Sequence, residues 1–143
     1  MAVVVKRIYD KVSANDGARV LVDRLWPRGI TKKGAALDAW LKELAPSDEL
    51  RQWSHAHREA WEMFRKRYLR ELTRPEAAEQ LQQLYHLARG RKRLTLLYAF
   101  KDEEHNNAVV LKDLLDGMKK PPTGTGPAAA GASRLRKAAR RPA

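Results

Sequence analysis

Three apolar runs in the chain have the length and composition of β-strands. Residues 3–9 are β-branched and aromatic, residues 19–26 have a continuous apolar centre, and residues 94–100 form the third run. A continuous apolar centre is typical of a strand that is buried on both faces. Asp16 and Gly17 form a turn signal between the first two runs, so these two strands could pair as a hairpin.

The segment between the second and third strands has the periodicity of helices. Apolar residues recur at intervals of three and four positions, and Pro46 interrupts the first of these stripes. Ser47, followed by two acidic residues, is typical of a helix start. We therefore expect about five helices, at residues 37–44, from Ser47 onward, at 61–72, at 81–88 and at 108–115.

A long helical connection between two strands favours their parallel pairing. The pattern therefore predicts an α/β fold with a small mixed, partly parallel sheet covered by about five helices. We expect a single domain over residues 1–120. In such folds ligands usually bind outside the carboxyl ends of the parallel strands.

The last segment, residues 121–143, differs in composition from the rest. It contains five basic residues, no acidic residue and one large aliphatic residue, Leu135. It cannot bury enough apolar surface to offset the entropy of ordering, so we predict a disordered basic tail. The tail is either a solvated terminus or a non-specific nucleic-acid arm that acts through counterion release. The basic residues of this arm would be Arg134, Arg136, Lys137, Arg140 and Arg141.

Composition narrows the classes of function. The chain has 143 residues, a formal net charge of +12 and no cysteine. The absence of cysteine excludes disulfides and thiol catalysis and fits a reducing compartment. No apolar run approaches the ~20 residues of a membrane helix. We predict a cytoplasmic protein without a membrane segment, a metal site or a cofactor; its oligomeric state is left open.

Two polar clusters follow predicted strands, and each has two interpretations. Asp23, Arg24, Trp26 and Arg28 lie at the carboxyl end of the second strand, after its apolar centre, and the segment of Lys101, Asp102, His105 and Asn106 follows the third. A structural interpretation makes Asp102 a helix N-cap and the first cluster an ion pair that holds a loop. A functional interpretation uses His105, because histidine is a common acid or base in proteins, and the two arginines, because guanidinium groups bind anions bidentately.

The leading hypothesis is a binding site for a small anionic metabolite or nucleotide at the strand ends. In an enzyme, His105 would be the general acid or base, oriented by Asp102 or Asp23. Arg24 and Arg28 would hold the anion and Trp26 would form an apolar wall. The other predicted ligand contacts are Lys101, Asn106, Arg7 and Tyr9. The alternatives are a nucleic-acid-binding protein that uses the basic body and tail, and a protein-interaction module in which the clusters are purely structural.

Four separated blocks resemble one known family. "KRIYD", "DGARVLVDRLWPRG", "LDAWLKELAPSDELRQW" and "LLYAFKDEEHNNAVVLKDLL" resemble, in this order, the YeaO-like family of small bacterial proteins, over roughly residues 3–116. The resemblance implies a compact α/β domain and assigns no reaction. More distant relatives place a cysteine at the end of the strand corresponding to 94–100, where this chain has Tyr98-Ala99-Phe100. The resemblance therefore implies that thiol chemistry does not operate here.

Overall fold

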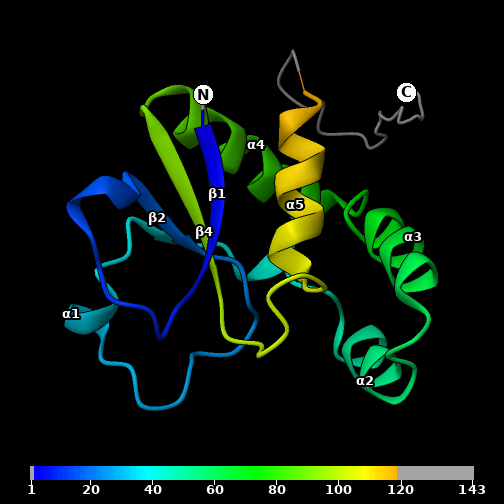
Figure 1. Cartoon of the computed structure of the whole chain (residues 1–143). Coiled ribbons are helices and arrows are strands. Elements are labelled where there is room, and N and C mark those ends of the chain that lie inside the picture. Colours follow the sequence, from blue (N-terminus) through cyan, green and yellow to red (C-terminus); the bar gives the residue numbers. More distant parts are fainter. Residues whose placement is uncertain (1, 119–143) are drawn as a thin grey trace. The chain divides into compact units, whose positions relative to one another are not determined.

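Four parallel strands form one sheet in the order β1-β4-β2-β3 (Figure 1). They belong to a computed structural model that describes residues 2–118. β4 pairs with β1 on one side and with β2 on the other, and β2 also pairs with β3. Since every pair is parallel, all four strands end at the same edge, which we term the carboxyl edge. The strands are β1 (Ala2–Arg7), β2 (Ala18–Leu21), β3 (Ala39–Trp40) and β4 (Arg93–Tyr98).

Helices account for most of the remaining residues, and the α/β class is confirmed. The described residues divide into two units, one of residues 2–45 and 86–117 and the other of residues 46–85 and 118. The first unit contains the sheet, α1 and α5, and the second contains α2, α3 and most of α4. Within residues 2–118 the α-helices are α1 (Lys32–Ala35), α2 (Asp48–Ala56), α3 (Trp61–Glu71), α4 (Pro75–Arg89) and α5 (Asn107–Asp116), and the 3₁₀ turns are η1 (Ala14–Asp16) and η2 (Lys42–Leu44).

The sheet differs from the prediction in its strand order. The described strands form no hairpin of β1 with β2, because β4 lies between them, and their sheet is parallel rather than mixed. All four residues of β2 are buried, which suits a strand with neighbours on both sides. The Asp16-Gly17 signal instead ends η1, where Ser13 and Asp16 form a reciprocal capping box.

The predicted helix over residues 37–44 is wrong. The segment forms the short strand β3 and then η2. The amide of Asp38 donates to the carbonyl of Arg19 at 2.8 Å, and the amide of Leu41 donates to the carbonyl of Leu21 at 2.9 Å. Hydrogen bonds to β2 therefore outweigh the local helical periodicity. The predicted strand 19–26 is also shorter in the structure, since β2 ends at Leu21.

The other predicted helices are confirmed. Ser47 caps α2 by accepting a hydrogen bond from the amide of Leu50 at 3.1 Å. Within the same unit, Glu71 at the end of α3 accepts from both the amide and the hydroxyl of Ser47, at 2.8 and 2.6 Å. α4 ends just before Gly90, whose amide donates to the carbonyl of His86 at 3.0 Å.

The core of the first unit lies between the sheet and α5, which packs on β1 and β4 (Figure 1). Burial of the apolar side chains between α5 and the sheet is the main force that holds the helix on the sheet. Among residues 2–118, no helix has both the length and the apolar content to cross a membrane. The predicted tail, 121–143, lies outside the described residues. The fully buried residues of this core include Val20, Leu94, Leu96, Leu111 and Leu115.

Candidate functional site

The two polar segments meet at the carboxyl edge through Asp23. One carboxylate oxygen of Asp23 accepts from the amide of Ala99 at 2.9 Å, and the other accepts from Nδ2 of Asn107 at 3.1 Å. The same Nδ2 donates to the carbonyl of Val22 at 3.0 Å. β2 and β4 are neighbours, so the residues that follow them emerge side by side. Asp23 therefore links the end of β2 to the end of β4 and to the start of α5.

Trp26 packs beside this link. Its ring meets that of Trp40 edge to face, with 5.3 Å between centroids. Nε1 of Trp26 donates to the carbonyl of Ile30 at 2.6 Å, and Nε1 of Trp40 donates to the carbonyl of Asp23 at 2.7 Å. Both rings cover a small buried cluster at the strand ends. Trp26 is thus a packing residue that shapes the loop after β2.

Arg24 is directed to residues of the η2 segment. Its guanidinium lies 3.6 Å from the carboxylate of Glu43 and donates a long hydrogen bond of 3.5 Å to the carbonyl of Ala45. All three residues belong to the first unit. This pairing fits the structural interpretation of Arg24, because an intramolecular carboxylate already neutralises its charge.

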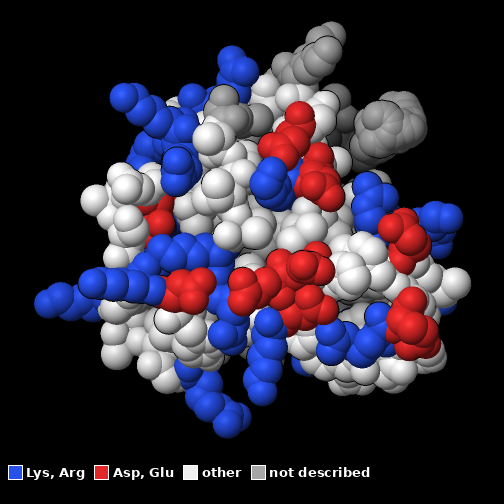
Figure 2. All heavy atoms as spheres, viewed as in Figure 1, with Lys and Arg blue, Asp and Glu red and all other residues white. Residues whose placement is uncertain are grey.

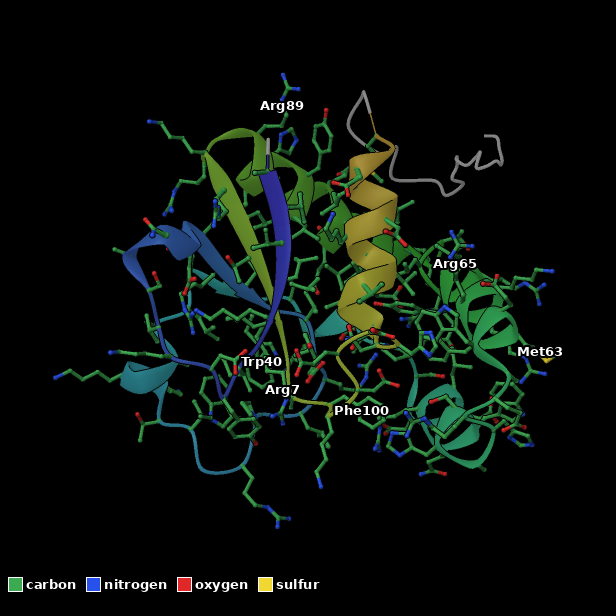
Figure 3. All side chains as sticks on the ribbon, in the orientation of Figure 1. Arg7, Trp40, Met63, Arg65, Arg89 and Phe100 are labelled. Carbon is green, nitrogen blue, oxygen red and sulfur yellow. The ribbon has the colours of Figure 1, made fainter. Side chains whose placement is uncertain are left out.

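Arg7, the last residue of β1, binds the end of β4. Its Nε donates to the carbonyl of Phe100 at 3.0 Å, and its Nη2 donates to the carbonyl of Ala99 at 2.9 Å. Figure 3 shows Arg7 and Phe100 close together at the carboxyl edge. These two carbonyls lie beyond the last residue of β4, so Arg7 fixes the direction in which the chain leaves the sheet toward Lys101.

Tyr9 connects β1 to the loop after β2. Its hydroxyl donates to the carbonyl of Arg28 at 2.9 Å. The guanidinium of Arg7 lies over its ring, 5.1 Å from the centroid. Arg28 and Lys101 are exposed, and Tyr9 is 44% exposed. Arg7, Tyr9, Arg28 and Lys101, which we term the carboxyl rim, therefore form a basic and aromatic group drawn from three segments of the chain.

The N-cap of α5 is Asn106 and not Asp102, the residue that the structural interpretation of the sequence assigned to this position. Asn106 is 4% exposed, and its side-chain oxygen accepts from the amide of Val109 at 3.0 Å. Asp102 instead closes a turn before the helix, accepting from the amides of Glu104 and His105 at 2.9 and 3.0 Å. The helix starts at Asn107 because Asn106 adopts the extended backbone of a cap, with φ −149° and ψ 170°.

His105 lies at the surface beside Asp102. Its Nδ1 is 4.0 Å from a carboxylate oxygen of Asp102, and its side chain is 49% exposed. An exposed imidazole beside a carboxylate at the carboxyl edge is accessible to a bound ligand.

The charges at this edge are mixed. Figure 2 shows acidic side chains gathered over the loop between β4 and α5, with basic side chains projecting from the lower edge beneath them. The exposed acids of this loop include Glu103 and Glu104. Burial raises the pKa of the Tyr98 phenol, and the nearby charges of Glu103 and Asp10 raise it further. Tyr98 therefore stays neutral at physiological pH.

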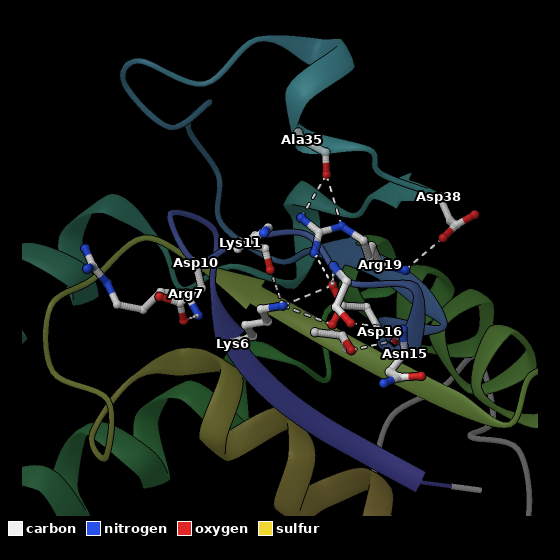
Figure 4. A network of polar contacts seen from close by, with 11 residues as sticks. Lys6, Arg7, Asp10, Lys11, Asn15, Asp16, Arg19, Ala35 and Asp38 are labelled. Atoms are coloured by element: carbon white, nitrogen blue, oxygen red, sulfur yellow. Dashed lines mark hydrogen bonds and ion pairs between the residues drawn. The ribbon is translucent and has the colours of Figure 1, made fainter.

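A buried ionic network in the same unit, which the sequence analysis did not predict, joins β1, η1, β2 and α1 (Figure 4). Asp16 binds Arg19 at 2.6 Å and Lys6 at 3.0 Å. Arg19 also donates two hydrogen bonds, of 3.1 and 2.9 Å, to the carbonyl of Ala35 at the end of α1. The sequence signal was Arg19 itself, a charge within an apolar strand, which predicts a buried partner.

Metal chemistry has no candidate site in this part of the chain. Residues 2–118 contain no group of three His, Asp or Glu side chains placed to hold an ion.

Comparison with known proteins identifies the family. A model described as the inactive DUF488-N3 subclade matches residues 2–130. The chain is 45% identical over 118 residues to the uncharacterized protein YeaO of Escherichia coli K12, covering 82% of this chain and 100% of YeaO. It is 40% identical over 113 residues to the uncharacterized protein Rv3073c of Mycobacterium tuberculosis, covering 79% and 92% of the two chains. No solved structure shows a significant match. The chain therefore belongs to the YeaO-like DUF488 family, within the group described as the inactive DUF488-N3 subclade.

Proposed function

We propose that the chain binds a small anionic ligand of the nucleotide class on the carboxyl rim and does so without catalysis. One observation carries the proposal: the Tyr9 hydroxyl holds the backbone of Arg28, while Arg7 holds the backbone of Phe100 beside Lys101. Two exposed cations are thus attached to an ordered framework around a partly exposed aromatic ring. The site also lies outside the carboxyl ends of parallel strands, where α/β proteins usually bind ligands.

The chemistry of the rim suits a phosphate joined to a planar ring. Arg28 can grip a phosphate with paired N–H donors, and Lys101 can add a point charge. The exposed ring of Tyr9 offers a stacking surface for a base. Glu103 and Glu104 repel anions, so the phosphate would lie on the Arg28 side of the rim.

Binding without catalysis fits the remaining features. The family model describes an inactive subclade, and the chain contains no cysteine. Of the acids predicted to orient His105, Asp23 holds the ends of β2 and β4 together, and Asp102 closes the turn before α5. His105 would then be a ligand contact, with Asn106 positioning its segment as the α5 cap. We also retain the prediction that the protein is cytoplasmic.

Titration calorimetry of the full chain with adenosine diphosphate tests the proposal. Arg28→Ala should weaken binding at least tenfold, about 1.4 kcal/mol. Tyr9→Phe, which keeps the ring and loses the hydrogen bond to Arg28, should give a smaller loss than Tyr9→Ala. The matched control is Arg70→Ala, an exposed arginine on α3. Equal affinities of the Arg28 and Arg70 variants, or no binding by the wild type, would refute the proposal.

A protein-interaction module is the second candidate, and a specific observation favours it. Three side chains at the centre of the strand ends form hydrogen bonds with backbone groups of the same unit: Arg7, Asp23 and Asn107. The centre of the predicted site therefore has a structural role. This reading predicts that no small ligand binds and that a protein partner co-purifies from the native host. Loss of that partner in a Leu25→Asp variant would support it, because Leu25 is the most exposed large apolar residue among those described.

A further inference from the structure

A dense group of basic residues lies at the other end of β4, away from the carboxyl rim. Residues 89–93 read Arg-Gly-Arg-Lys-Arg, and all five are exposed. Figure 2 shows basic side chains gathered at the top of the first unit, where α4 leads into β4, and Figure 3 labels Arg89 there. We term Arg89, Arg91, Lys92 and Arg93 the basic turn.

Few acids balance this charge. Arg91 pairs with Asp38 at 3.2 Å, and both side chains are partly exposed. Within residues 2–118, Arg89, Lys92 and Arg93 have no acidic partner. Like charges this close repel one another and cost stability, and a bound polyanion relieves that cost. The basic turn therefore has an excess of about three positive charges available to a ligand.

The backbone beneath these cations is held in place. Arg89 ends α4, and the amide of Gly90 donates to the carbonyl of His86 at 3.0 Å. Arg93 starts β4 and pairs with Ala2 of β1. The turn at Gly17 lies directly against the backbone of Arg93. A helix end and a strand start thus present the cations from an ordered turn, which lowers the entropic cost of forming several contacts at once.

The chemistry of the turn favours nucleic acid over a membrane surface. Membrane-surface binding by a basic segment is strengthened by apolar side chains that enter the lipid. The exposed large apolar residues of the described chain are Tyr9, Val12, Leu25 and Met63, and the basic turn contains none of them. Three arginines and a lysine without an aromatic neighbour in the turn match contacts to phosphates that do not read the bases.

We propose that the basic turn is a phosphate-backbone contact site for nucleic acid, separate from the carboxyl rim. It does not depend on the proposed nucleotide binding, because it uses other residues at the opposite edge of the sheet. It also differs from the predicted tail arm, since all of its residues belong to the folded unit. Contacts of this kind weaken steeply with salt and show little preference for sequence.

Fluorescence anisotropy of the full chain with a labelled 20-base-pair DNA duplex, over a series of salt concentrations, tests the proposal. The patch variant combines Arg89→Ala, Lys92→Ala and Arg93→Ala. A control variant removes the same charge from exposed lysines elsewhere, as Lys32→Ala, Lys33→Ala and Lys66→Ala. Both variants retain the basic residues of the C-terminal segment, so its contribution is equal in the two.

The patch variant should bind DNA at least tenfold more weakly than the control variant. The plot of log K against log salt concentration should also be shallower by about 2.7, since each of the three lost phosphate contacts contributes ~0.9 to the slope. A conservative variant, Arg89→Lys with Arg93→Lys, should retain most of the binding and so separate charge from folding. Equal weakening in the patch and control variants would overturn the proposal, as would a wild-type protein that binds no DNA. Patch-dependent binding to phosphatidylserine vesicles without DNA binding would assign the turn to membranes instead.

Discussion

Asn107 and Asp23 are hydrogen-bonded side chain to side chain at 3.1 Å although 84 positions separate them in the sequence. Asp23 follows β2 and Asn107 opens α5, so this bond joins two of the segments that meet at the carboxyl edge. The second carboxylate oxygen of Asp23 accepts from the amide of Ala99 at 2.9 Å. Asp23, which the sequence suggested as a residue that orients His105, thus holds the ends of β2 and β4 and the start of α5 together.

Asp23→Ala should destabilise the fold by about 1 to 3 kcal/mol, because the partly buried donors of Ala99 and Asn107 lose their acceptor. Urea unfolding at pH 7 would measure the loss. Glu59→Ala, which removes an exposed carboxylate, should stay within about 0.5 kcal/mol of the wild type. If both variants unfold at the same urea concentration, Asp23 is not a structural residue.

Asp16→Asn should cost about 3 kcal/mol at pH 7, because Arg19, which is 4% exposed, loses its carboxylate. Burial alone raises the pKa of Asp16, but hydrogen bonds from Ser13, Lys6 and Arg19 outweigh burial, so the pKa lies below its usual 3.8. A depressed folded-state pKa means that this stability is present above pH 3.8 and is lost as the pH falls below it.

Urea unfolding of the wild type and Asp16→Asn at pH 7 and at pH 3 would check that the stability contributed by Asp16 falls with the pH. The difference in unfolding free energy between the two should shrink at the lower pH. Asp113→Asn, at an exposed position on α5, should show little difference from the wild type at either pH. A difference in unfolding free energy between wild type and Asp16→Asn that grows as the pH falls would contradict the role assigned to Asp16.

Two glycines with positive φ should respond differently to alanine. Gly17 has φ +66° and Gly29 has φ +80°. A Cβ on Gly17 would overlap the carbonyl oxygen of Arg93, whereas a Cβ on Gly29 would meet nothing within 4 Å. Gly29→Ala should therefore cost about 1 kcal/mol of backbone strain. Gly17→Ala should cost at least about 2 kcal/mol, since strand β4 must shift as well. Thermal unfolding would compare the stabilities of the two variants. A Gly17→Ala variant more stable than Gly29→Ala would contradict the close approach of the turn at Gly17 to β4.

His55 should titrate below its ordinary pKa of 6.5. Burial lowers the pKa, and the charges of Arg51 and Arg58 lower it further. NMR titration of the imidazole resonances would measure the value. Arg58→Gln should raise the pKa and Arg58→Lys should leave it nearly unchanged. Because the folded-state pKa is depressed, His55 lowers stability as the pH falls below 6.5, and a pKa above 6.5 would contradict this account.

Local patterns were sufficient for much of the fold. Ser47 indicated the start of α2, and the apolar stripes indicated α3, α4 and α5, because the pattern of a helix depends on residues only three or four positions apart. The apolar runs likewise identified β1, β2 and β4. The shared position of the two polar segments followed from one further rule, that parallel strands end at the same edge.

The roles of the polar residues depended on partners far away in the sequence. Asp102 and Asn106 are both good caps, and only the path of the chain after β4 made Asn106 the cap of α5. The sequence analysis did not identify the basic turn, and its position against the turn at Gly17 was found only in the structure.

The sequence by itself determined the α/β class, the elements with strong periodicity and the polar character of the strand ends, because these depend on near neighbours and on composition. The tertiary structure alone decided that β4 lies between β1 and β2 and that residues 37–44 form β3 and η2. The physical reason is that strand pairing joins residues many positions apart. The hydrogen bonds from Asp38 and Leu41 to β2 outweigh a helical preference of a few tenths of a kcal/mol per residue.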